Sequence, residues 1–387
     1  MEETPQSESE APRRNSARER HQRRKQQGMA QPSNIPRQLK PSGGIALPAI
    51  RLPVNRLVIY GVAGAIFLIV VVMLLGRLKN QTPKTSANAI WIGTQWTYDN
   101  PDDAALTALV QKLRDHQVGV VYAWVSLLQS NNAWSDTDKL DSVKAFVQRF
   151  KKLYPESHLY GWLSIDAQPV DSNTARLADA SMQQIVADFS QRMTAEFKFD
   201  GVMLNVVPVF NKDENYLEVL RKVHSSIGEN ASLAVAVPPD WTPTDVSIPM
   251  PPHIEPGTFW DEDYKQRVAL IADQVVVTAY NSGIVASADY SAWMAYQVKT
   301  FSSALAGLQT AAGIPASTDL LIGVPAYNTQ ALTHDTNVEN IPSAVAGIRT
   351  GLADSKDTAK YVKGIAIYFE SQMNDDDWTQ LKQLWSN

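Results

Sequence analysis

The strongest constraint on the fold is a repeated alternation of short apolar runs and longer helix-like stretches from residue 89 onward. The apolar runs lie at 90–96, 118–126, 158–165, 201–207, 232–237, 274–280, 320–327 and 364–369. Runs that are apolar on both faces are typical of a parallel sheet covered by helices. Eight strand–helix units predict a (β/α)8 barrel, a TIM barrel, over 89–387. A doubly wound open sheet is the alternative, but it normally carries a glycine-rich turn after its first strand, which is missing here.

The first 88 residues differ in composition from the rest of the chain. Residues 1–56 contain 11 Lys and Arg against 5 Asp and Glu, whereas the whole chain of 387 residues has a formal net charge of −5. The next segment, 57–76, reads LVIYGVAGAIFLIVVVMLLG and carries no charge. A helix of that length matches a hydrocarbon core of roughly 30 Å. We therefore expect a disordered basic tail at 1–56, a transmembrane signal-anchor helix at 57–76 and a polar linker at 77–88.

Two other interpretations of 57–76 are weaker. A buried core helix rarely lacks a polar face over such a length, and a cleaved signal peptide has a shorter apolar region nearer the first residue. The positive-inside rule then predicts a single-pass cell-membrane protein with its N-terminus in the cytoplasm and its barrel outside. The acidic balance of the remaining chain argues against a nucleic-acid partner.

The sequence lacks several kinds of reactive site. It has no Cys, which excludes disulfides, thiolate metal sites and a cysteine nucleophile. Its His residues form no i, i+4 pair and no HExxH pattern, so we expect no metal. There is also no Walker-type loop and no GxSxG elbow, and no cofactor is predicted.

Aromatic and polar residues stand where the predicted strands end. In a (β/α)8 barrel, function lies at the carboxyl ends of the strands. Aromatic faces suit the apolar C–H faces of sugar rings, and Asn, Asp and Glu side chains suit the hydroxyl groups. The candidate binding residues are Trp96, Trp124, Asp166, Asn205, Trp241, Tyr280, Asn281, Tyr327 and Glu370. In contrast, Trp91 and Trp162 lie in the middle of their strands and are expected in the core.

Four of the strand motifs together resemble the family 18 glycoside hydrolases, the chitinase-like barrels. The fourth strand, FDGVMLNVVPV (199–209), is similar to the D-G-x-D-x-D-x-E strand of that family. Three further segments resemble the sixth, seventh and eighth strands of that family: VVVTAYN (275–281), LLIGVPAYN (320–328) and GIAIYFES (364–371). The resemblance extends over 89–387 with the elements in the same order. It implies a membrane- or wall-associated protein whose partner is an N-acetylated polysaccharide or peptidoglycan.

The residues that carry catalysis in that family are replaced in this chain. The last Glu of the family's strand is the general acid, and the Asp two residues before it orients the substrate's N-acetyl group, whose carbonyl oxygen attacks the anomeric carbon. The resemblance places Val207 at the acid, Asn205 at the orienting Asp and Met203 at the inner Asp. Tyr280, which would hold the acetamido group, is retained, but the acid beside it is Asn281.

Three functions remain open at this point. The first is a catalytically impaired barrel, a pseudoenzyme, tethered outside the membrane and binding a cell-wall or surface glycan in an aromatic cleft. The second is an active glycosidase that uses Asp166 and Glu370, whose carboxyl groups would be about 5–5.5 Å apart for retention or about 6.5–9.5 Å apart for inversion. The third is a scaffold that binds a protein, which a cleft filled by its own loops would favour.

Overall fold

The computed structural model describes residues 87–168, 175–243, 246–312 and 316–386. The predicted tail at 1–56 and the predicted span at 57–76 lie outside these residues, as does the linker up to residue 86. Within the described part, no helix combines the length and the apolar character needed to cross a membrane.

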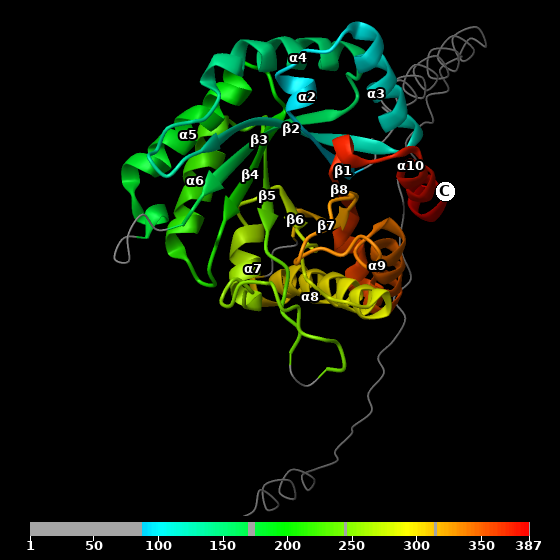
Figure 1. Cartoon of the computed structure of the whole chain (residues 1–387). Coiled ribbons are helices and arrows are strands. Elements are labelled where there is room, and N and C mark those ends of the chain that lie inside the picture. Colours follow the sequence, from blue (N-terminus) through cyan, green and yellow to red (C-terminus); the bar gives the residue numbers. More distant parts are fainter. Residues whose placement is uncertain (1–86, 169–174, 244–245, 313–315, 387) are drawn as a thin grey trace, which may run out of the picture. The chain divides into compact units, whose positions relative to one another are not determined.

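In the described residues, eight parallel strands close into the predicted barrel (Figure 1). The strands are β1 (Asn88–Ile92), β2 (Val118–Leu128), β3 (His158–Asp166), β4 (Gly201–Val207), β5 (Ser232–Val237), β6 (Gln274–Val277), β7 (Asp319–Pro325) and β8 (Val362–Tyr368). Each strand pairs with the next along the chain, and β8 pairs with β1. Closure therefore leaves no open strand edge.

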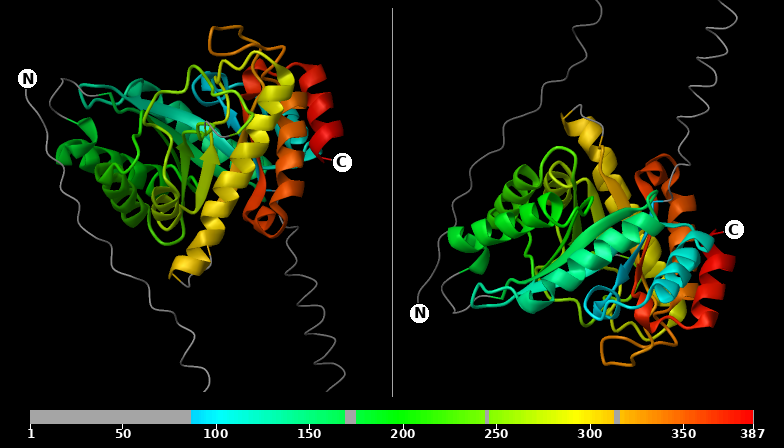
Figure 2. Two further views of the ribbon diagram at one scale, coloured as in Figure 1. Left: turned by 90° about the horizontal axis from the view of Figure 1, so that it is seen from below. Right: turned by 90° about the horizontal axis from the view of Figure 1, so that it is seen from above.

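Helices follow the strands and lie outside them in both views of Figure 2. They are α2 (Thr94–Thr97), α3 (Asp103–Asp115), α4 (Leu140–Leu153), α5 (Ala180–Ala195), α6 (Glu214–Ile227), α7 (Glu262–Ala269), α8 (Ser287–Ala312), α9 (Ile341–Ser355) and α10 (Asp375–Leu381). Several begin at a short polar side chain that accepts a backbone N–H of the first turn, as Asp102 does for α3 and Asn340 for α9. These caps satisfy N–H groups that have no partner inside the helix.

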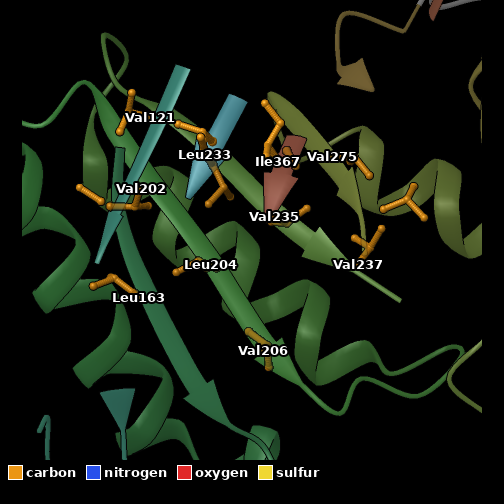
Figure 3. Packing of buried hydrophobic residues seen from close by; sticks show 14 of the residues in the cluster. Val121, Leu163, Val202, Leu204, Val206, Leu233, Val235, Val237, Val275 and Ile367 are labelled. Carbon is orange, nitrogen blue, oxygen red and sulfur yellow. The ribbon is translucent and has the colours of Figure 1, made fainter. Parts of the chain in front are cut away.

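Alternate residues of each strand face two different cores. On β4, Val202, Leu204 and Val206 pack in the layer between strands and helices, as Figure 3 shows from close by. Other strand residues fill the barrel lumen, and its larger side chains are Trp91, Tyr122, Tyr160, Trp162 and Met203. The exposed fractions of Trp91 and Trp162 are 2% and 8%, which confirms the core positions predicted for them.

The first strand is shorter than the apolar run 90–96 predicts. β1 ends at Ile92, and the chain then forms the short helix α2, in which the N–H of Tyr98 donates to the carbonyl of Thr94 at 2.7 Å. Trp96 therefore lies on a helical turn above the end of β1 and not on the strand itself.

Candidate functional site

A cavity of about 350 Å³ lies at the carboxyl ends of β4, β5 and β6. We call it the mouth cavity. Its lining includes four predicted residues, Asn205, Val207, Tyr280 and Asn281. It also includes residues that the sequence did not single out, among them His253, Glu255, Thr278 and Tyr368. The cavity thus occupies the end of the barrel where barrel proteins place their chemistry.

Along β4, every second residue points towards the barrel axis, and these residues become more exposed towards the mouth. Met203 is fully buried in the lumen, Asn205 is half-buried, and Val207 is 56% exposed. Asn205 Nδ2 donates to Ser164 Oγ on β3 at 3.4 Å. Val207 pairs in register with Asp166 at the end of β3. An apolar side chain, that of Val207, is therefore exposed in the cavity at the end of β4.

Tyr280 reaches the mouth cavity because β6 is shorter than predicted. β6 ends at Val277, and two successive three-residue turns, in which N–H groups donate to carbonyls two residues earlier at 2.9 Å, lead to Tyr280. The ring of Tyr280 stacks on Tyr368, with centroids 5.0 Å apart and an interplanar angle of 15°. Burial raises the pKa of Tyr280 well above its ordinary value. Its hydroxyl therefore stays protonated at neutral pH and is available as a hydrogen-bond donor.

A buried carboxylate fixes the loop that follows Tyr280. Glu339 accepts the backbone N–H groups of Asn281 and Ser282 at 2.8 Å each, and it lies 3.0 Å from His334 Nδ1. Asn281 has φ of 58°, a left-handed conformation that Asn tolerates. The hydroxyl of Tyr327 donates to Asn281 Oδ1 at 2.6 Å. The amide NH₂ of Asn281 is thus the part left to bind a ligand.

Trp96 and Glu370 meet on the side of the rim formed by β1 and β8. Trp96 Nε1 donates to Glu370 Oε2 at 2.7 Å, and Gln95 Nε2 donates to the same oxygen at 3.3 Å. Burial raises the pKa of Glu370, while these two hydrogen bonds act in the opposite direction. On β2, Trp124 packs edge-on against Trp162, with ring centroids 4.6 Å apart.

The structure does not bring the predicted tryptophans into one cleft. Trp241 lies in a second cavity, where its ring stacks on Phe259. Among the described residues that line the mouth cavity there is no tryptophan, so neither Trp96 nor Trp124 belongs to the lining. Tyr327 is also outside the lining, but its ring packs edge-on against Tyr280, which belongs to it.

Sequence reasoning missed the residues that the loop between β5 and α7 brings to the mouth cavity. His253 and Glu255 lie on this loop, and Glu255 is the one carboxylate among the described lining residues. The loop has no apolar periodicity that would have placed them. Tyr368 ends the β8 run, so its position as a strand-end aromatic was a usable signal. In the part of the chain that the structure describes, no group of three His, Asp or Glu side chains is placed to hold a metal ion.

Comparison with known proteins gives a likeness in structure only. No family model and no curated protein matches the sequence. Among solved structures, the chain is similar to the spore cortex-lytic enzyme SleL of Bacillus cereus, with a TM-score of 0.50, 11% identity, and coverage of 76% of this chain and 73% of that chain. A class V chitinase from Pseudomonas fluorescens Pf-5 has a TM-score of 0.50 at 14% identity, with 77% and 98% covered. The group IV chitinase of Ostrinia furnacalis in complex with allosamidin has a TM-score of 0.50 at 13% identity, with coverage of 78% of this chain and 99% of that chain. At such identities the likeness establishes the fold, the parallel barrel of chitinases and SleL.

Proposed function

We propose that the barrel is a family 18-like domain that binds an N-acetylated polysaccharide or peptidoglycan in the mouth cavity and is catalytically impaired. The observation that carries this proposal is Val207. Its side chain is exposed in the cavity. The resemblance in sequence matches it to the family's general acid, and valine has no proton to give. The structural likeness to two chitinases and SleL supports the glycan as the ligand class.

The mouth cavity offers neutral hydrogen-bonding groups and an aromatic surface. The hydroxyl of Tyr280 and the amide of Asn281 are donors that suit the carbonyl and hydroxyl oxygens of an N-acetylated sugar. Tyr368, stacked under Tyr280, adds an apolar ring against which the C–H face of a sugar packs. Asn205 is an amide where the family has an Asp, so it binds a hydroxyl group without holding or passing on a proton.

Replacing Tyr280 by Ala is expected to weaken the binding of chitotriose to the full-length chain by about tenfold or more, because it removes a donor and one stacked ring. The control is Tyr280→Phe, which keeps the ring on Tyr368 and removes only the hydroxyl, and it should give an intermediate loss. Isothermal titration calorimetry measures both. Unchanged affinity in Tyr280→Ala, or no binding by the unsubstituted chain, would contradict the proposed function.

We also infer that the chain is a single-pass membrane protein with a cytoplasmic N-terminus and an extracytoplasmic barrel. The support is the uncharged run 57–76 behind the basic tail 1–56. Protease added to intact cells is expected to digest the barrel and to spare an epitope tag placed in the tail, as read by immunoblot. Loss of the tag with an intact barrel would reverse the orientation, and protection of both would contradict a span.

One observation favours an active glycosidase as a second function. Burial raises the pKa of Glu370, which suits a general acid. Against this, Glu370 is outside the mouth-cavity lining, and its Oε2 already accepts two hydrogen bonds. A scaffold that binds only protein has no such observation in its favour, because the mouth cavity is not filled by the barrel's own loops.

A further inference from the structure

A second cavity, of about 530 Å³, lies on the other side of the loop between β5 and α7. We call the described parts of this loop, residues 238–243 and 246–261, the wall loop. Pro239 and Thr258 line the mouth cavity, whereas the residues directly after them, Asp240 and Phe259, line the second cavity. In Figure 1 the yellow-green loop that precedes α7 projects beyond α7 and α8. The wall loop therefore separates two cavities and borders both.

The second cavity contains an aromatic surface that faces solvent. Trp241 and Phe259 stack with ring centroids 5.4 Å apart and an interplanar angle of 17°. Trp241 covers one side of the Phe259 ring, yet Phe259 is 39% exposed, so the rest of its ring faces solvent. Met250, also exposed, lies in the same lining. A ring held flat by a second ring is a suitable surface for the apolar face of a sugar.

Buried polar contacts hold the base of the second cavity. Lys265 of α7 and Asp240 of the wall loop form a buried ion pair. The carbonyl of Asp240 accepts hydrogen bonds from Trp293 Nε1 at 3.1 Å and from Gln297 Nε2 at 3.0 Å, both on α8. The stem of the wall loop is thus fixed to the barrel on the side where Trp241 begins the aromatic surface.

The charged groups of the second cavity point to a neutral ligand. Asp240 and Glu262 are balanced by Lys265 and Lys299, so the lining has no excess of either charge. The indole N–H of Trp241 is buried and has no acceptor in the described structure. Because this N–H has no accessible surface, the exposed ring of Phe259 is the contact that the lining offers to a ligand.

We propose that the second cavity is a further binding site for a neutral N-acetylated glycan and holds sugars of the same chain beyond those in the mouth cavity. This inference rests on the proposed function, since the glycan must first occupy the mouth cavity. A chain that crosses the wall loop would place one sugar face on the exposed ring of Phe259. Two linked contacts bind more tightly than either alone, provided that one ligand reaches both.

The test compares a short and a long oligomer on the full-length chain by isothermal titration calorimetry. Chitohexaose is expected to bind the unsubstituted chain about tenfold or more tightly than chitotriose. Phe259→Ala should remove this advantage and leave chitotriose affinity unchanged. Ser303→Trp, which fills the second cavity from α8, should have the same effect. Phe210→Ala is the matched control, because Phe210 is 43% exposed and belongs to neither lining.

Three results would overturn the inference. Equal affinity for both oligomers means that the second cavity adds nothing, and an advantage of chitohexaose that survives Phe259→Ala and Ser303→Trp places the extra contact elsewhere. In both cases a loss of binding in Tyr280→Ala would leave the proposed function standing. If the unsubstituted chain binds neither oligomer, the proposed function and this inference fail together.

Discussion

Met203→Asp is expected to lower the free energy of unfolding by about 3 kcal/mol or more at neutral pH. Met203 is fully buried in the lumen, in register with Trp162 on β3 and Ala234 on β5. A carboxylate there loses its hydration. The indole N–H of Trp162 has no partner in the described structure, and this single donor cannot replace the lost hydrogen bonds to water. Chemical denaturation of the full-length chain measures the difference.

The acidity of the introduced carboxyl gives this prediction a second readout. Burial raises the pKa of a carboxyl group, so its folded-state pKa lies above its unfolded value. The decrease in the free energy of unfolding is then fully present above the folded-state pKa and becomes smaller as the pH falls through that pKa. We therefore expect a smaller decrease at about pH 4 than at about pH 7. Met203→Leu is the control, with an expected cost below about 1.5 kcal/mol. Equal stability of the two variants at neutral pH would mean that the lumen holds polar partners for a charge.

The double substitution Asn205→Asp with Val207→Glu is expected to create hydrolysis of chito-oligosaccharides about 10²-fold or more above the unsubstituted chain. Val207 is exposed in the mouth cavity, so a longer acidic side chain fits without burial. Asp166, its register partner on β3, is a like charge that raises the pKa of the introduced carboxyl, as a general acid requires. Met203 is left in place because it belongs to the core.

Two single substitutions separate the parts of this effect. Val207→Glu alone supplies a proton donor without the Asp that orients the acetamido group, and Asn205→Asp alone supplies the orientation without the acid. Each should remain near the background rate, as measured by reducing-end release. A double variant that binds chitotriose normally but gains less than about tenfold would mean that the pocket no longer positions the substrate for the chemistry.

Most of the fold follows from local patterns in the sequence. The β4 and β5 runs are apolar on successive residues, because one face packs on helices and the other fills the lumen, and both strands have the predicted bounds. The ends of β1 and β6 were predicted too far along the chain, at residues 96 and 280. At both ends the apolar residues continue into short turns that backbone hydrogen bonds form. A pattern of apolar residues does not reveal such backbone hydrogen bonds.

The site was predictable where strands carry it and not where loops do. Asn205 and Val207 both line the mouth cavity, because alternate residues of a strand share a face. Trp241 follows β5 by only a few residues, but the wall loop turns it away from the mouth cavity into the second cavity. Glu339 was not identified, because its role comes from a contact between segments far apart in the chain: it precedes α9 and holds the loop after β6.

We propose that the mouth cavity holds a glycan without cleaving it. The most direct measurement is the mass of the ligand recovered after chitohexaose has been bound by the full-length chain and released by denaturation. From this proposal we expect binding at equilibrium and recovery of the intact hexamer. Recovery of shorter products would contradict it, and Glu255→Gln, Asp166→Asn and Glu370→Gln would then show which carboxyl group supplies the proton.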